Sequence, residues 1–154
     1  MAKRRPLAPP IFDPALSGAP LAGIGRRLAS MLYEGLVVFA VLLIGFWLPQ
    51  TLLAGMGLDI SPRLLWLHLL LLMMLYFVWF WLHGGQTLPM KTWKLRLIDA
   101  NGGPPRPLQA VLRYLAALPS ILLCGIGILW ALLDPDRQFL HDRIAGTRIV
   151  SQQS

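Results

Sequence analysis

The stretch LASMLYEGLVVFAVLLIGFWL, residues 28–48, decides the fold of this chain. Its 21 residues carry a single charge, Glu34. A helix of that length crosses a hydrocarbon core of about 30 Å. Trp47 and Pro49 mark the far end, where aromatic side chains gather at a membrane–water interface. The sequence therefore predicts a transmembrane helix from about Ile24 to Leu48.

A second apolar run follows residues 49–61, which hold two glycines and one acid and are typical of a short loop. Pro62 suits the first turn of a helix. Between Leu64 and Leu82, His68 is the only basic or acidic side chain. We expect the second transmembrane helix over residues 62–83, with an aromatic belt of Tyr76, Trp79 and Trp81 at its end.

A third apolar segment, residues 110–133, contains Arg113, Pro119, Gly125 and Gly127. Helix breakers at these positions suit a kinked or re-entrant segment. Lys and Arg in short loops favour the cytoplasm, and they cluster before residue 28, over residues 84–108 and over residues 137–148. If all three clusters lie in the cytoplasm, the chain crosses the membrane an even number of times. It favours re-entrance, and one full crossing of this segment stays the alternative.

Two short segments have the composition of strands. Residues 92–99 alternate around Trp93, Leu95 and Leu97, and residues 146–150 form a second candidate. They can pair only if both lie on the same side of the membrane. The expected fold is an all-α membrane protein with two full transmembrane helices, a third kinked or re-entrant segment and a small cytoplasmic β-ribbon. Residues 1–20 are expected to be a flexible, proline-rich cytoplasmic tail, 21–150 the membrane domain and 151–154 a short tail.

The composition excludes several classes of protein. Of 154 residues, 56% are hydrophobic and 14% charged, against about 25% charged in soluble domains. The net charge of +7 comes from bases that flank the apolar runs, which indicates contact with anionic lipid at the cytoplasmic face rather than with nucleic acid. Cys124 has no partner for a disulfide. Without a nucleophile–base pair, a phosphate loop or metal-ligand spacing, we expect no enzyme, no cofactor and no metal.

Glu34 is the outstanding charge, because a carboxylate inside hydrocarbon costs several kcal/mol and has to face protein or water. It is either a proton or cation site, or a structural carboxylate held by a base such as Arg113 or by helix amides. Arg27 lies two helical turns earlier on the same face, about 10 Å away along the axis, which is too far for a direct pair.

Several motifs together resemble a known family. They are Arg27, an acid seven residues later, Gly85-Gln86-Thr87 with Met90-Lys91, Arg113, and QFLHDRIAGT at residues 138–147. Over roughly residues 20–150, the chain resembles the RDD family of bacterial membrane proteins, named for one arginine and two aspartates. The resemblance implies a small helical membrane domain, and transport of unidentified ligands with cation/proton exchange in some members. It adds a cytoplasmic motif to the candidate site: Gln86, Thr87, Lys91, His141, Asp142, Gly146 and Thr147.

The chain departs from the family pattern at two positions. Glu34 replaces the first aspartate, and Pro89 replaces a glycine, which puts any need for positive φ there in doubt. The second aspartate matches as Asp142. We expect Arg27, Arg113 and Asp142 to form a cluster that holds the membrane part and the tail together, and Gln86-Thr87 to cap the end of the second helix.

Two functions remain open from the sequence. The first is a small transporter or ion- or proton-coupled module, in which Glu34 is the exchanging group and Arg27 and Arg113 tune it. Such a protein is expected to form homo-oligomers, because two or three helices rarely enclose a pathway. The alternative is an assembly or scaffold partner of another membrane protein, packed through Gly35, Ala40 and Gly45. In either case we expect a multi-pass protein of the bacterial cytoplasmic (inner) membrane with its N-terminus in the cytoplasm.

Overall fold

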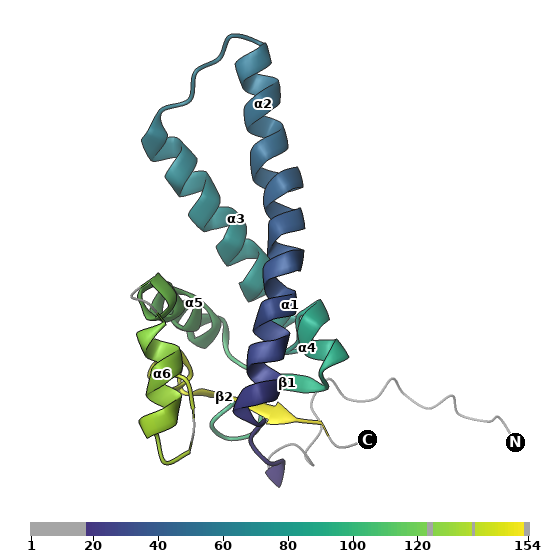
Figure 1. The fold of residues 1–154 in the computed structure, drawn as a ribbon, viewed down its shortest axis with the longest axis vertical. Helices are drawn as coiled ribbons and strands as arrows, with labels where there is room; N and C mark the ends of the chain where they lie inside the picture. The colour runs from purple at the N-terminus through teal and green to yellow at the C-terminus, as the bar shows by residue number, and fades with distance from the viewer. Residues whose placement is uncertain (1–17, 123–124, 137, 153–154) are drawn as a thin grey trace, which may run out of the picture.

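The computed structural model describes residues 18–122, 125–136 and 138–152. A long helical hairpin rises from a smaller base (Figure 1). Its first arm is continuous through α1 (Ile24–Leu42), the π-helical turn η2 (Leu43–Trp47) and α2 (Leu48–Gly55). Residues 56–61 connect it to the second arm, α3 (Pro62–Leu82). Residues 1–17 of the predicted tail, and residues 153–154, lie outside the described part.

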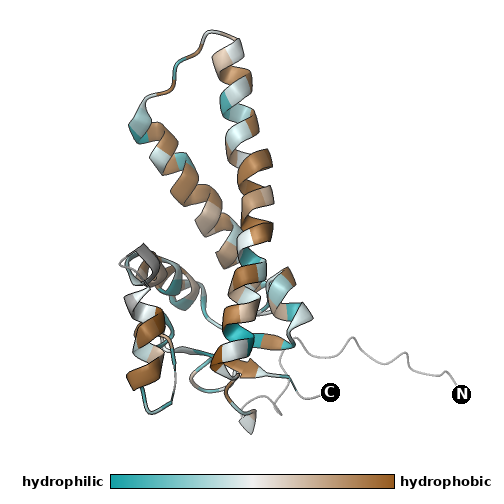
Figure 2. Cartoon of the chain, viewed as in Figure 1, coloured by the Kyte–Doolittle hydropathy of each residue, from teal (hydrophilic) through white to brown (hydrophobic). Residues whose placement is uncertain are grey.

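Both arms are long and apolar enough to cross a membrane, and no other helix of the described residues is. Figure 2 shows the hydrophobic colour running along both arms. In the most apolar stretch of the first arm, no residue is buried inside the protein. In the corresponding stretch of α3, the buried share is 6%. The prediction of two long apolar helices is therefore confirmed.

The first arm continues past Leu48, where the sequence predicted its end at Pro49. A proline ring clashes with the carbonyl four residues earlier in an α-helix. Here the wider π-turn comes just before the proline, and the Leu48 N–H donates to the Leu43 carbonyl five residues back. Pro49, which has no N–H to donate, then follows in the first turn of α2. The loop is therefore shorter than the predicted one: it covers residues 56–61 instead of 49–61.

The base contains α4 (Leu88–Thr92), β1 (Leu95–Asp99), α5 (Pro107–Leu122), α6 (Ile126–Leu133), α7 (Leu140–Ala145) and β2 (Thr147–Ser151). The two strands pair antiparallel with Leu97 opposite Ile149, which confirms the predicted ribbon. The first strand starts later than expected, because Thr92 closes α4.

Residues 20–22 pair with the other edge of β2. The Ala22 N–H donates to the Ile149 carbonyl at 3.0 Å, and the Ser151 N–H donates to the Pro20 carbonyl at 3.1 Å. One small sheet therefore joins three segments of backbone. They come from just before the hairpin, from just after it and from the end of the described chain.

The third apolar segment is broken into two helices, as its composition predicted, but the break is not at Pro119. That proline lies inside α5. α6 starts after Gly125, whose φ of 73° is a left-handed conformation that favours glycine. α5 and α6 approach closely at Gly127, where a Cβ would lie 2.4 Å from the Ser120 Cβ. The two helices have 16 and 8 residues.

A small hydrophobic core lies where the hairpin meets the base. Trp81 at the end of α3 packs with Leu97 of β1, Tyr114 of α5 and Ile149 of β2. α5 also packs on α7 and α3. This packing fixes the position of α5 and α7 beneath the hairpin and so positions the charged residues described next.

Candidate functional site

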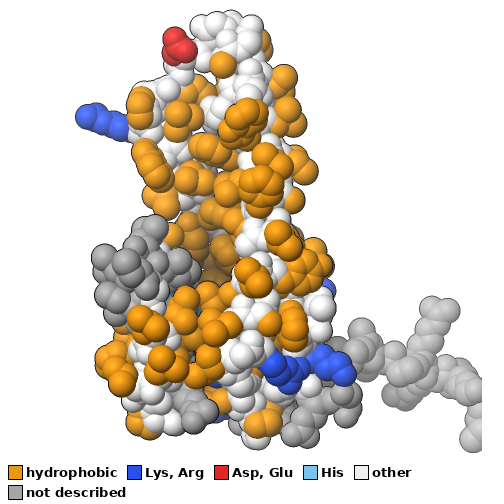
Figure 3. Space-filling view, viewed as in Figure 1, with side chains coloured by type: hydrophobic (Ala, Val, Ile, Leu, Met, Phe, Trp, Pro, Cys, Tyr) orange, Lys and Arg blue, Asp and Glu red, His pale blue; other side chains and the backbone are white. Residues whose placement is uncertain are grey.

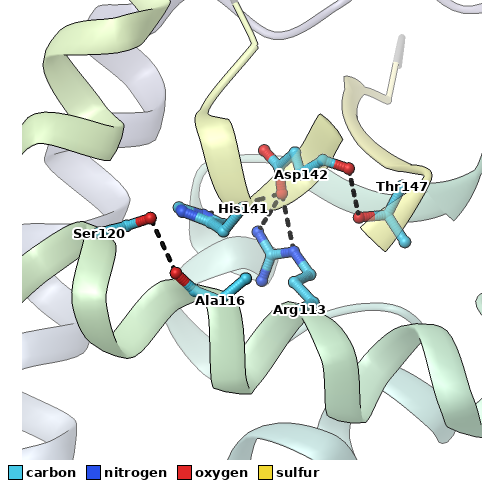
Figure 4. A network of polar contacts seen from close by, with 6 residues as sticks. All are labelled: Arg113, Ala116, Ser120, His141, Asp142 and Thr147. Carbon is cyan, nitrogen blue, oxygen red and sulfur yellow. Dashed lines mark hydrogen bonds and ion pairs between the residues drawn. The ribbon is translucent and has the colours of Figure 1, made fainter. Parts of the chain in front are cut away.

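A buried ion pair connects α5 to α7 (Figure 4). Arg113 of α5 donates from Nε at 2.8 Å and from Nη2 at 2.7 Å to Oδ1 of Asp142. The Asp142 side chain is 0% exposed. The guanidinium carbon of Arg113 also lies 4.3 Å from the centre of the Trp81 ring, which is within the range of a cation–π contact. One arginine therefore holds α3, α5 and α7 together.

Arg27 of α1 reaches the same cluster. Its side chain is buried, and its guanidinium carbon lies 5.3 Å from the centre of the Phe139 ring. Its charge is attracted by Asp142 and repelled by Arg113. The structure thus gathers the three predicted residues, with the direct ion pair between Arg113 and Asp142.

The neighbours of Asp142 also come from the predicted cytoplasmic motif. Thr147 Oγ1 donates to the Asp142 carbonyl, and Gly146 ends α7 in the left-handed conformation. Oδ2 of Asp142 has no hydrogen-bond partner among the described residues. His141 is buried beside the pair, and burial lowers its pKa to about 4, so the imidazole is neutral near pH 7.

A second ion-pair cluster was not anticipated from the sequence. Arg143 of α7 contacts Asp134 at 2.7 Å and the exposed Asp136 at 2.9 Å. A hydrogen bond from the Gln138 N–H, aided by Arg143, lowers the pKa of Asp134. This cluster ties residues just after α6 to α7, the helix that carries Asp142.

Glu34 is bound by two hydroxyl groups. Tyr76 of α3 donates to Oε1 at 2.7 Å, and Thr87 donates to Oε2. Among the described residues, no Arg, Lys or His forms an ion pair with this carboxylate. The base suggested from the sequence, Arg113, pairs with Asp142 instead. Sequence reasoning missed Tyr76 because it was assigned to the aromatic belt, although it is the only hydroxyl between residues 64 and 82.

The residues after the hairpin act differently from the prediction. Thr87 does not cap the end of α3; its hydroxyl accepts from the Met90 N–H and so begins α4. Gln86 donates to the Leu95 carbonyl and to the Gln152 side chain, which joins this segment to the sheet. Lys91 is exposed in the last turn of α4. Pro89 lies in the first helical turn, so no positive φ is needed there.

A cavity of about 460 Å³ lies between α1, α3 and α5, and Glu34 is on its wall. Figure 3 shows a hollow below the two arms, bordered by hydrophobic side chains. The wall combines a few polar groups with many apolar ones. The polar set includes Arg27, Glu34, Thr87 and Arg113; the apolar set includes Val38, Met73, Phe77 and Leu118.

An apolar two-helix hairpin, closed at its base by a buried Arg–Asp pair and an Arg on the first helix, defines a small helical domain of the RDD type. The chain belongs to the RDD family, which it matches over residues 21–146. It is similar to the uncharacterized protein RP437 of Rickettsia prowazekii (strain Madrid E), with 36% identity over 76 residues. That match covers 49% of this chain and 42% of the relative. No solved structure matches the chain.

Proposed function

We propose that this chain is a multi-pass protein of the bacterial cytoplasmic membrane, not an enzyme, and that Glu34 is the site at which it exchanges a proton or a cation. The observation that carries the proposal is the environment of Glu34. The carboxylate lies on the wall of a cavity between apolar helices, and two neutral hydroxyls bind it.

The membrane location is supported by the outer surface of the hairpin. Leu32, Leu36, Phe39 and Ile44 of the first arm are all well exposed. A soluble monomer rarely exposes a continuous apolar surface of this kind, because water contact with it is unfavourable. Lipid is the solvent that removes this penalty.

The topology is supported by the small sheet, which joins residues 20–22, 95–99 and 147–151. These segments share one side of the membrane if only the hairpin crosses it. A full crossing by α5 and α6 would separate β2 from β1. We therefore propose that α5 and α6 re-enter from the base, and that the base with the N-terminus faces the cytoplasm and its anionic lipids.

The chemistry of the proposal follows from the cost of a charge in hydrocarbon. A carboxylate there has to bind a proton or stay close to a cation. Each oxygen of Glu34 accepts one hydroxyl hydrogen bond and has another lone pair available. Glu34 can therefore hold a proton or an inorganic cation in turn. Because two arms alone do not enclose a pathway, we propose a homo-oligomer as the working unit.

Proteoliposomes with a pH dye, or with a sodium or potassium dye, test this proposal. We expect purified protein to dissipate a proton or cation gradient. Glu34→Asp, which restores the family residue and keeps the carboxylate, should retain flux. Glu34→Gln should lower the rate about tenfold or more, equivalent to about 1.4 kcal/mol in the barrier. Undiminished flux in Glu34→Gln would remove Glu34 from the mechanism.

The alternative is an assembly partner whose polar residues are structural. It is favoured by the close packing of the hairpin at Gly45, where a Cβ would lie 3.0 Å from Leu72, and by the buried Arg113–Asp142 pair. A membrane protein that co-purifies in fixed ratio, together with the absence of flux in the wild type, would support this alternative.

A further inference from the structure

We infer that the cavity between α1, α3 and α5 holds one acyl chain of a bilayer phospholipid, which enters sideways while the head group of the lipid stays outside. The inference rests on the membrane placement proposed above, but not on ion exchange at Glu34. It assigns a lipid site, and it specifies that this site recognises the hydrocarbon chain and not the head group.

The two arginines on the cavity wall are engaged by the base of the protein. Arg113 makes two contacts of 2.7 and 2.8 Å with Asp142. Arg27 is buried over the Phe139 ring and is attracted by the same aspartate. Their charges serve the packing of α1, α5 and α7. A charged head group is therefore not what this wall is built to bind.

The other polar groups on the wall are also bonded within the protein. Each oxygen of Glu34 accepts a hydrogen bond from a hydroxyl group. The Tyr114 hydroxyl donates to the Leu70 carbonyl at 3.0 Å. Buried polar groups that already have partners gain little from a further polar ligand. The wall therefore favours a ligand that brings no polar group into the cavity.

Almost all of the surface that the cavity offers to a ligand is apolar. Val38, Met73, Phe77 and Leu118 are among the side chains that provide it. Water does not fill an apolar cavity, because it finds too few hydrogen-bond partners there. An empty cavity would leave its lining without packing contacts, and protein interiors rarely contain large voids. Hydrocarbon is the filling that satisfies this wall.

The size and length of the cavity suit one flexible chain. Its volume of about 460 Å³ is in the lower half of the usual range of about 300–1,000 Å³ for small-ligand sites. Arg27 and Val38 both line it, and the eleven residues of α1 between them extend about 16 Å. Met31 and Met73 are unbranched and polarizable, so they can pack against different chain conformations.

The chain has direct access from the bilayer. Figure 3 shows the hollow below the two arms, bordered by hydrophobic side chains of the surface that we place in lipid. The side chains that border this hollow are apolar like the lipid around them. An acyl chain can therefore bend into the cavity without crossing water, and its head group can remain at the membrane surface.

Photolabelling in nanodiscs tests the inference. The probes are phosphatidylcholine and phosphatidylglycerol, each with a diazirine on the same acyl chain, and labelled residues are mapped by mass spectrometry. We expect the cavity residues Val38, Met73 and Phe77 to be labelled more strongly than Leu36 and Phe39, which are exposed outside the cavity. Both probes should give equal yields in the cavity, because the chain alone enters it.

Two glycines of α1 provide a matched pair of variants. A Cβ at either Gly35 or Gly25 meets nothing within 4 Å. Gly35 lines the cavity and Gly25 does not. We expect Gly35→Leu to reduce labelling of the cavity residues about tenfold, equivalent to about 1.4 kcal/mol of binding. Gly25→Leu should leave it unchanged. If Gly35→Leu does not fold, Gly35→Val places a smaller side chain at the same position.

Native mass spectrometry of the detergent-purified protein identifies the source of the chain. We expect one phospholipid bound to each protein chain, and its loss in Gly35→Leu. A free fatty acid or long-chain alcohol in its place would overturn the assignment to a bilayer phospholipid. Cavity labelling that differs between the two head groups would overturn recognition by the chain alone. Labelling that is uniform over all exposed faces and unaffected by Gly35→Leu would reduce the site to bulk lipid contact.

The outcomes also separate this inference from the proposed function. Protein that stays soluble and monomeric without detergent would reject the membrane placement, and the lipid site with it. Cavity labelling in a protein without flux would leave the lipid site standing and reject ion exchange at Glu34. Flux without cavity labelling would do the reverse.

Discussion

Asp142 and Arg113 carry opposite charges that water cannot reach, and this makes their pair sensitive to the loss of either partner. Removing one partner of a buried pair leaves an uncompensated charge and typically costs about 3–5 kcal/mol. We expect Asp142→Asn to lose stability on that scale, measured by thermal unfolding in detergent. Asp136 offers a matched control, because it pairs with Arg143 but its side chain is 57% exposed.

Asp136→Asn should cost about 0–1 kcal/mol, since surface pairs contribute little. Replacing both Arg113 and Asp142 by apolar residues should recover part of the loss, because neither member of the pair is then left without the other. Equal melting temperatures for Asp142→Asn and Asp136→Asn would contradict the structural role of the buried pair.

His141 makes stability depend on pH. Burial lowers its pKa to about 4 in the folded protein, while the unfolded chain keeps the usual value of about 6.5. Between these values the unfolded chain binds a proton that the folded protein does not. Stability is therefore lost as the pH falls below 6.5, by about 2 kcal/mol from pH 7 to pH 5.

Unfolding measured at pH 7 and pH 5 tests this expectation. His141→Gln should flatten the pH dependence, whereas His83→Gln should not, because His83 is exposed. If His141→Gln and the wild type lose equal stability on acidification, another group is responsible.

The predictability of the site varies with the kind of signal. Arg27, Arg113 and Asp142 stand out as charges at motif positions, so their meeting was predicted. The partners of Glu34 were not, because Tyr76 and Thr87 are distant in sequence and neutral. Only the folded hairpin brings a hydroxyl on α3 and another at the start of α4 to the same carboxylate.

Among the elements, the α5–α6 pair depends on a close approach. Gly127 has space for no side chain, since a Cβ there would lie 2.4 Å from the Ser120 Cβ, and Ser120 Oγ is engaged with the Ala116 carbonyl at 2.8 Å (Figure 4). We expect Gly127→Ala to cost about 1–3 kcal/mol through overpacking, measured by thermal unfolding.

Gly25→Ala is the matched control, because a Cβ at Gly25 meets nothing within 4 Å. It should be neutral, or stabilising by up to about 1 kcal/mol through helix propensity. A stability gain in Gly127→Ala of the same size would mean that α5 and α6 do not pack as described.

Element boundaries were the least predictable part of the fold. Apolar runs located both arms, because burial in lipid or protein requires continuous apolar surface. The end of the first arm was wrong by seven residues (Leu48 against Gly55). A proline ordinarily ends a helix, and the π-turn that lets the helix continue leaves no local sequence signal. The short helix α7 was likewise hidden inside the motif at residues 138–147.

At the scale of the whole molecule, the base collects segments from the two ends of the described chain. The sheet joins residues 20–22 to β2, and β2 to β1, so the hairpin is a single excursion away from the base. This arrangement was predicted only as a preference, from the distribution of Lys and Arg. Backbone hydrogen bonds between distant segments cannot be read from composition, although both strands were predicted as candidates and the first showed alternation.

The proposed role of Glu34 depends on a topology in which the hairpin alone crosses the membrane, twice. Single cysteines in a Cys124→Ser background test it most directly, labelled in intact cells by a membrane-impermeant maleimide. Suitable exposed positions are Gly18, Asn101 and Pro135 in the base and Met56 in the hairpin loop. We expect labelling from outside at Met56 alone, and at the other three positions only after the cells are opened. Labelling of Pro135→Cys from outside would mean that α5 and α6 cross the membrane, and would contradict a topology in which only the hairpin crosses.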